Sequence, residues 1–86
     1  MKTKEKDESY NGWKNWQTWN VALWIENDEG LYREARRYRH KLRPYGAFVE
    51  SLQGIGGDIE KETPDGASWT DSGLDIDALN EMIEEL

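Results

Sequence analysis

Apolar residues recur at helical spacing in several stretches of the chain, and the first of these is the richest in tryptophan. Residues 16–28 read WQTWNVALWIEND, and Asn15 is suited to cap a helix here because its side chain can accept a hydrogen bond from a first-turn amide. Apolar side chains occur nearly all round this helix, which is typical of a central, enclosed helix. A buried strand is the alternative, since Trp, Val and Ile favour sheets, but a run of this length without a turn signal favours a helix. The residues assigned to the core rather than to a site are Trp16, Trp19, Leu23 and Ile25.

Two further helices are predicted before residue 54. Residues 31–43 (LYREARRYRHKLR) carry one narrow apolar stripe at spacings of four, three and four. Gly30 is expected to end the preceding helix in a left-handed conformation, and Pro44 to interrupt this one. After Pro44, apolar side chains at i, i+3, i+4 and i+7 predict a short helix that Gly54 closes. These side chains are Tyr45, Phe48, Val49 and Leu52.

A glycine-rich stretch, residues 54–73, has no sustained period and predicts a long loop. A long loop in a small domain needs an anchor, and Trp69 is expected to supply it with help from Ile55 and Ile59. A short strand at Ile59 is the alternative. The run Thr63-Pro64-Asp65-Gly66 is a turn signature.

The last helix is predicted over residues 75–86 (DIDALNEMIEEL), with Asp75 and Asp77 at its positive end. Its apolar face is expected to hold Ile76, Leu79, Ile83 and Leu86. Residues 11–86 are therefore expected to form one small all-α domain of three to four helices around the tryptophan-rich helix. Residues 1–10 (MKTKEKDESY) have too little apolar surface to offset the entropy of ordering them, which predicts a disordered, charged tail.

Charge is strongly segregated along the chain. The 86 residues include 11 basic and 18 acidic side chains, a formal charge of −7 at pH 7. Six of the basic side chains fall within residues 31–43 and are the candidate contact with a polyanion or a partner: Arg33, Arg36, Arg37, Arg39, Lys41 and Arg43. Either the acidic second half of the chain neutralises these cations within the molecule, or they bind an external polyanion such as nucleic acid.

The acidic half has its own functional interpretation. Residues 44–86 hold eleven acids against Lys61 alone, and a rigid acidic surface can occupy the basic groove of a partner. Simple solubility is the alternative explanation. The candidate acidic partner surface is Glu81, Glu84 and Glu85.

Catalytic and metal-binding chemistry is not expected. Zero Cys and a single histidine, His40, exclude thiolate and paired-histidine sites, and no serine has the context of a nucleophile elbow. We therefore expect no enzyme, no catalytic or metal-binding residue and no cofactor. No apolar stretch is long enough for a membrane and no signal-peptide core follows Met1, so a cytoplasmic protein without membrane contact is expected.

Two blocks of the sequence resemble a family of small uncharacterised proteins from bacteriophages, plasmids and bacteria, cyanobacteria among them. The first block is NGWKNWQTWNVALWI followed by NDEGLY, over residues 11–32, and the second is TPDG with Trp69 and the acidic tail, over residues 63–86. Together they cover about half the chain, and residues 33–62 lie outside the resemblance. The family has no assigned activity, so the resemblance implies only a mobile-element context and no functional residues.

The sequence as a whole favours a non-enzymatic protein-binding module, with a mobile-element-encoded modulator of a host protein as its sharpest form. The alternative is a nucleic-acid-binding accessory protein that uses the basic helix over residues 31–43. The sequence predicts neither the identity of the partner nor the oligomeric state.

Overall fold

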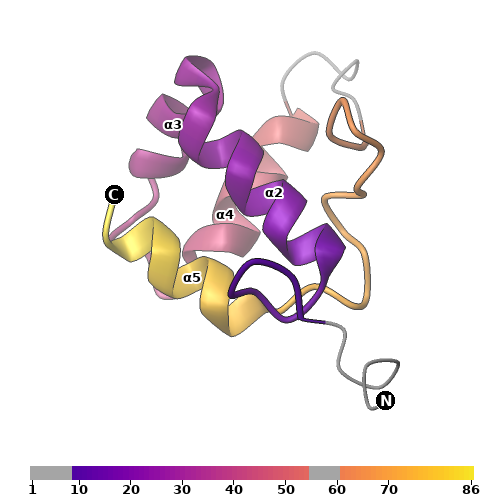
Figure 1. Cartoon of the computed structure of the whole chain (residues 1–86). Coiled ribbons are helices and arrows are strands. Elements are labelled where there is room, and N and C mark those ends of the chain that lie inside the picture. The colour runs from indigo at the N-terminus through magenta and orange to yellow at the C-terminus, as the bar shows by residue number, and fades with distance from the viewer. Residues whose placement is uncertain (1–8, 55–60) are drawn as a thin grey trace, which may run out of the picture.

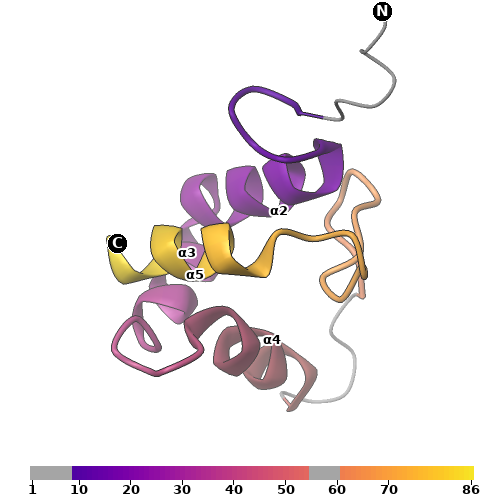
Figure 2. The same ribbon diagram turned by 90° about the horizontal axis from the view of Figure 1, so that it is seen from below.

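The computed structural model describes residues 9–54 and 61–86, and four helices pack around one core in that part of the chain (Figure 1). They are α2 (Trp16–Asn27), α3 (Glu29–Arg36), α4 (Pro44–Gly54) and α5 (Ile76–Glu84). In Figure 2, α5 lies between α2 and α4. The expected small all-α domain is therefore what the described residues form. Ile55, Ile59 and the strand considered there lie outside them, as do residues 1–8 of the predicted tail.

α2 begins at its predicted cap and turns one of its two apolar faces to the core. The side chain of Asn15 accepts from the Thr18 amide at 3.0 Å. Val21 and Ile25 are fully buried on the inner face, because the other helices pack on that side, whereas the chain before α2 lies over the opposite side (Figure 2).

The outer face of α2 corrects part of the predicted core. Trp16 is 37% exposed, so its assignment to the core is wrong, and Trp19 and Leu23 are only half-buried. The apolar residues that occur all round α2 thus belong to two opposite faces, of which the bundle covers one. Tyr10 lies 4.7 Å from Trp19 between ring centroids, so the folded part includes a residue that we placed in the tail.

A single residue joins α2 to α3. The Asp28 amide donates to the Trp24 carbonyl at 2.9 Å and ends α2, while its side chain accepts from the Leu31 amide at 3.0 Å and begins α3. Gly30 therefore lies inside α3 and does not end α2, contrary to the prediction. α2 therefore ends at the residue whose side chain caps α3, and no glycine in a left-handed conformation is needed to end it.

The core is completed by α4, α5 and the anchor of the loop between them. Phe48 is fully buried and lies 5.9 Å from the Trp69 ring, which is 6% exposed. The Tyr45 hydroxyl donates to the Trp69 carbonyl at 2.7 Å, and burial raises the pKa of this hydroxyl. Trp69 is thus the anchor that the sequence predicted.

The turn at residues 63–66 is held on α2 by a hydrogen-bonded cluster. The carboxylate of Asp65 accepts from the Asn20 amide group at 2.8 Å and from the Trp24 indole at 2.9 Å. The Thr63 hydroxyl donates to the Asn20 side-chain oxygen at 2.6 Å. Because both donors favour the charged carboxylate, they hold the pKa of Asp65 below its usual value.

The lowered pKa of Asp65 predicts an acid-dependent loss of stability. A carboxyl whose pKa is lower in the folded state stabilises the fold above its unfolded pKa, about 3.9, and this contribution disappears as the pH falls through the folded value. The stability difference between wild type and Asp65→Asn, measured by urea unfolding, should therefore be largest at neutral pH and shrink below about pH 4. A difference that stays constant from neutral to strongly acidic pH would contradict this account.

Candidate functional site

The acidic candidates stand on the outer side of α5. Asp75 caps the helix by accepting from the Ala78 amide at 3.2 Å. Leu79 and Ile83 are fully buried against the core, which turns the glutamates of the helix outward. Glu81, Glu84 and Glu85 are all exposed. Ile76, which we expected on the buried face, is 42% exposed and lies at the first residue of α5, at the edge of a pocket that it lines together with residues of α4.

A tight turn before α2 positions a tryptophan opposite α5. Tyr10 and Trp13 exchange two backbone hydrogen bonds of 2.7 and 2.8 Å, and the residues between them, Asn11 and Gly12, have φ values of 48° and 89°. Asn-Gly with positive φ at both positions is typical of the type I′ turn that closes a two-residue hairpin. The turn therefore fixes the backbone position from which the half-buried Trp13 side chain extends.

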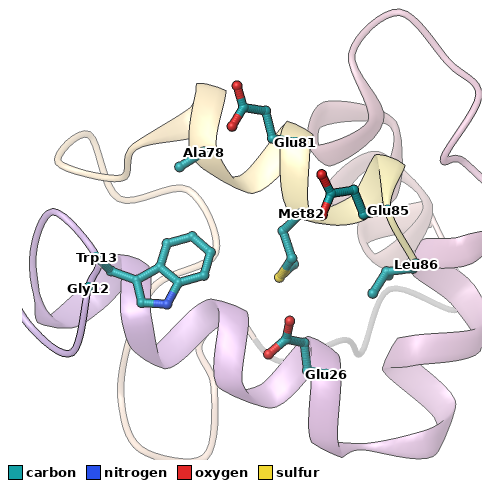
Figure 3. Close-up of a pocket in the computed structure, with 8 residues that line it drawn as sticks. All are labelled: Gly12, Trp13, Glu26, Ala78, Glu81, Met82, Glu85 and Leu86. Carbon is teal, nitrogen blue, oxygen red and sulfur yellow. The ribbon is translucent and has the colours of Figure 1, made fainter.

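Trp13 lines a groove of about 500 Å³ between α2 and α5 (Figure 3). The side chains of Trp13 and Met82 point into the space between α2 and α5, and Glu26 rises from α2 toward Met82. The lining residues are Gly12, Trp13, Glu26, Ala78, Glu81, Met82, Glu85 and Leu86. We call this feature the acidic groove.

The acidic groove combines an apolar floor with carboxylates of one sign. Glu26, Glu81 and Glu85 line it, and no lysine or arginine does. In the part of the chain that the structure describes, none of these carboxylates forms an ion pair. Carboxylates are ionised at neutral pH, so the groove presents uncompensated negative charge next to an indole ring and a thioether.

The basic candidates divide between a shorter helix and a loop. The helix predicted over residues 31–43 is wrong in its second half, because α3 ends at Arg36. Residues 37–43 form a loop between α3 and α4 (Figure 2). Tyr38 still packs against the core, but Leu42, expected on the apolar stripe, is 92% exposed. Cations three and four positions apart repel one another in a helix, and this run offers too few apolar contacts to offset the repulsion. We call residues 37–43 the basic turn.

Two of the six basic candidates pair with acids close to them in the sequence, and others form no ion pair in the part of the chain that the structure describes. Arg33 pairs with Glu29 at 2.8 Å and Arg37 with Glu34 at 3.3 Å. Arg36, Lys41 and Arg43 form no ion pair within residues 9–54 and 61–86. The hypothesis that the acidic half neutralises the basic run is therefore not supported among the described residues, where each ion pair joins residues three or four positions apart in α3 and at its C-terminal end.

Sequence reasoning found two of the three glutamates in the acidic groove. Glu84, the third candidate, does not line the groove. Glu26 was missed because only the packing of α2 against α5 brings it opposite Glu81 and Glu85. Trp13 was not among the predicted site residues, and the structure places it, half-buried, in the lining of the groove.

The described part of the chain contains neither a cluster of metal ligands nor a membrane-spanning helix. No group of three or more histidine and acidic residues there could hold a metal ion. None of the helices described is long and apolar enough to cross a membrane.

The described residues define a small helical protein with an acidic groove and a separate basic turn. Over residues 6–86 the chain matches the model of a family of unknown function, DUF7249, and it belongs to that family. Searches among curated proteins and among solved structures gave no match.

Proposed function

We propose that this chain is a non-enzymatic protein-binding module whose acidic groove binds a basic segment of a partner protein. The observation that carries the proposal is the set of three unpaired carboxylates around Trp13 and Met82. Opposite charge steers association and fixes orientation, while aromatic and methionine side chains supply adaptable contact area. Lysine and arginine side chains match both properties, because each carries a charge at the end of an apolar stem.

The composition of the groove favours a peptide segment over a small metabolite. Its polar groups are carboxylates at the rim, and the groove lacks the mixed donors and acceptors that orient a small polar ligand. An arginine can also stack on an indole face while its guanidinium contacts a carboxylate. The resemblance to small phage and plasmid proteins supports a host protein as the partner.

Neutralising the groove should weaken binding of a basic peptide. The double variant Glu81→Gln/Glu85→Gln removes two exposed carboxylates, each expected to contribute about 0.5–1 kcal/mol to a surface ion pair. The affinity for a fluorescent oligo-arginine peptide, measured by anisotropy at low salt, should fall roughly tenfold. Raising the salt should weaken wild-type binding in the same direction.

The matched control changes the same charge elsewhere. Glu50 and Glu62 are exposed and lie outside the groove, so Glu50→Gln/Glu62→Gln should leave the affinity within about twofold of wild type. If both double variants weaken binding equally, the peptide responds to net charge alone and the groove is not its site. Glu84→Gln should likewise have little effect.

Nucleic acid is the second candidate partner, and the unpaired Arg36, Lys41 and Arg43 favour it. Binding through these cations would weaken steeply with salt, since each phosphate contact releases counterions. The net charge of −7 opposes it. A flat titration with short DNA and RNA at about 50 mM salt would remove this candidate.

A further inference from the structure

The basic turn carries an exposed apolar side chain between two cations, and this combination complements the acidic groove. Leu42 is 92% exposed, and Lys41 and Arg43 on either side of it form no ion pair among the described residues. Among the described residues, four large apolar side chains are exposed, and Leu42 has the largest exposed fraction of the four. Leu42 contributes nothing to the core, and with the two cations beside it the turn presents an apolar side chain within a basic surface.

We infer that the basic turn of one copy of this chain docks in the acidic groove of a second copy. The inference rests on the proposed function, because it names an occupant for the same groove. Leu42 matches the apolar floor formed by Trp13, Met82 and Leu86. The cations of the turn match the carboxylates of the rim, Glu26, Glu81 and Glu85.

The contact forms between copies and not within one. Leu42 could not be 92% exposed if the turn occupied the groove of its own chain. The ion pairs that these cations form among the described residues, Arg33 with Glu29 and Arg37 with Glu34, do not involve the groove. Within the described residues, turn and groove are thus two separate surfaces of one molecule.

Because turn and groove are different surfaces, the contact is head-to-tail. Such a heterologous contact joins copies into open chains, or into a ring if the rotation closes. The contact is small and mostly charged, so we expect a dissociation constant between about 10 μM and 1 mM at low salt. High salt should dissolve the assembly, since the charges at its rim are exposed.

Sedimentation equilibrium of the full chain at low salt tests the inference. The wild type should show an average mass that rises above the monomer as concentration increases. Leu42→Asp places a carboxylate where the groove is acidic, and Glu81→Lys/Glu85→Lys makes the groove basic. Each variant alone should stay monomeric, and circular dichroism should show both folded because all three positions are exposed.

Mixing the two variants gives the sharpest result. Leu42→Asp keeps an intact groove and Glu81→Lys/Glu85→Lys keeps an intact turn, so one working contact remains between them. The mixture should form a 1:1 dimer that does not grow further. Matched controls are Ile76→Asp, at another exposed aliphatic residue, and Glu84→Lys, beside Glu85 but outside the groove; both should associate like the wild type.

Failure of this inference can be told apart from failure of the proposed function. A wild type that stays monomeric up to about 1 mM, or mixed variants that stay monomeric, would overturn the head-to-tail contact. If oligo-arginine still binds the wild type and not Glu81→Lys/Glu85→Lys, the groove remains a site for another basic protein. If neither self-association nor peptide binding occurs, both proposals are wrong.

Discussion

Replacing Phe48 by alanine should lower the free energy of unfolding by about 3–5 kcal/mol. The Phe48 ring is fully buried and lies 6.1 Å from the Tyr45 ring and 5.9 Å from the Trp69 ring. Its removal leaves a cavity where α4 meets the loop anchor, and the neighbouring rings lose contacts that no other side chain can replace. A domain of this size has about 4–13 kcal/mol of stability in total, so the loss is a large share of it.

Urea unfolding followed by tryptophan fluorescence and circular dichroism would measure this loss. Phe48→Leu is the matched control, because it keeps most of the buried volume and should cost less than about 1.5 kcal/mol. A loss below about 1 kcal/mol in Phe48→Ala would show that the ring does not hold the loop to α4.

Replacing Asn20 by alanine should cost about 2–3 kcal/mol, since a buried donor loses its acceptor and a cavity is created. The Asn20 side chain is 1% exposed and contacts both the Thr63 hydroxyl and the Asp65 carboxylate. Its loss leaves the Thr63 hydroxyl without its acceptor and leaves the Trp24 indole as the remaining side-chain donor from α2 to the Asp65 carboxylate.

The same helix offers a control for the loss of an asparagine. Asn27 is exposed and donates only to the Leu23 carbonyl at 2.8 Å, so Asn27→Ala should change stability by less than about 0.5 kcal/mol. Thermal and urea unfolding of both variants would separate the two positions. Equal losses would mean that the cluster around Asp65 contributes no more than an ordinary surface hydrogen bond.

The parts of the fold that followed from the sequence depend on local signals. Asn15 caps α2 as predicted, and Pro44 begins α4 as its first residue, since both effects involve only the nearest turn of backbone. Trp69 is buried as predicted, because a long loop in a small domain needs an anchor and Trp69 is the largest apolar side chain in it.

The parts that did not follow depend on which elements meet. α2 has two apolar faces, and its sequence does not say which one the bundle covers, so Trp16 was misplaced while Ile25 was not. The early end of α3 arises because repulsion among cations outweighs a thin apolar stripe. The acidic groove brings Glu26 next to residues some sixty positions later in the chain, a pairing that no local pattern contains.

The shared cap at Asp28 leaves the connection between α2 and α3 without slack. One inserted residue would change the orientation of α3 relative to α2, since a single residue ends α2 through its backbone amide and begins α3 through its side chain. The orientation of α3 relative to α2 therefore determines where residues 37–43 lie relative to Glu26 on α2. We expect insertions and deletions among related sequences to occur after Arg36 and not at Asp28. The distance between the acidic groove and the basic turn would then vary only with the length of the loop after α3.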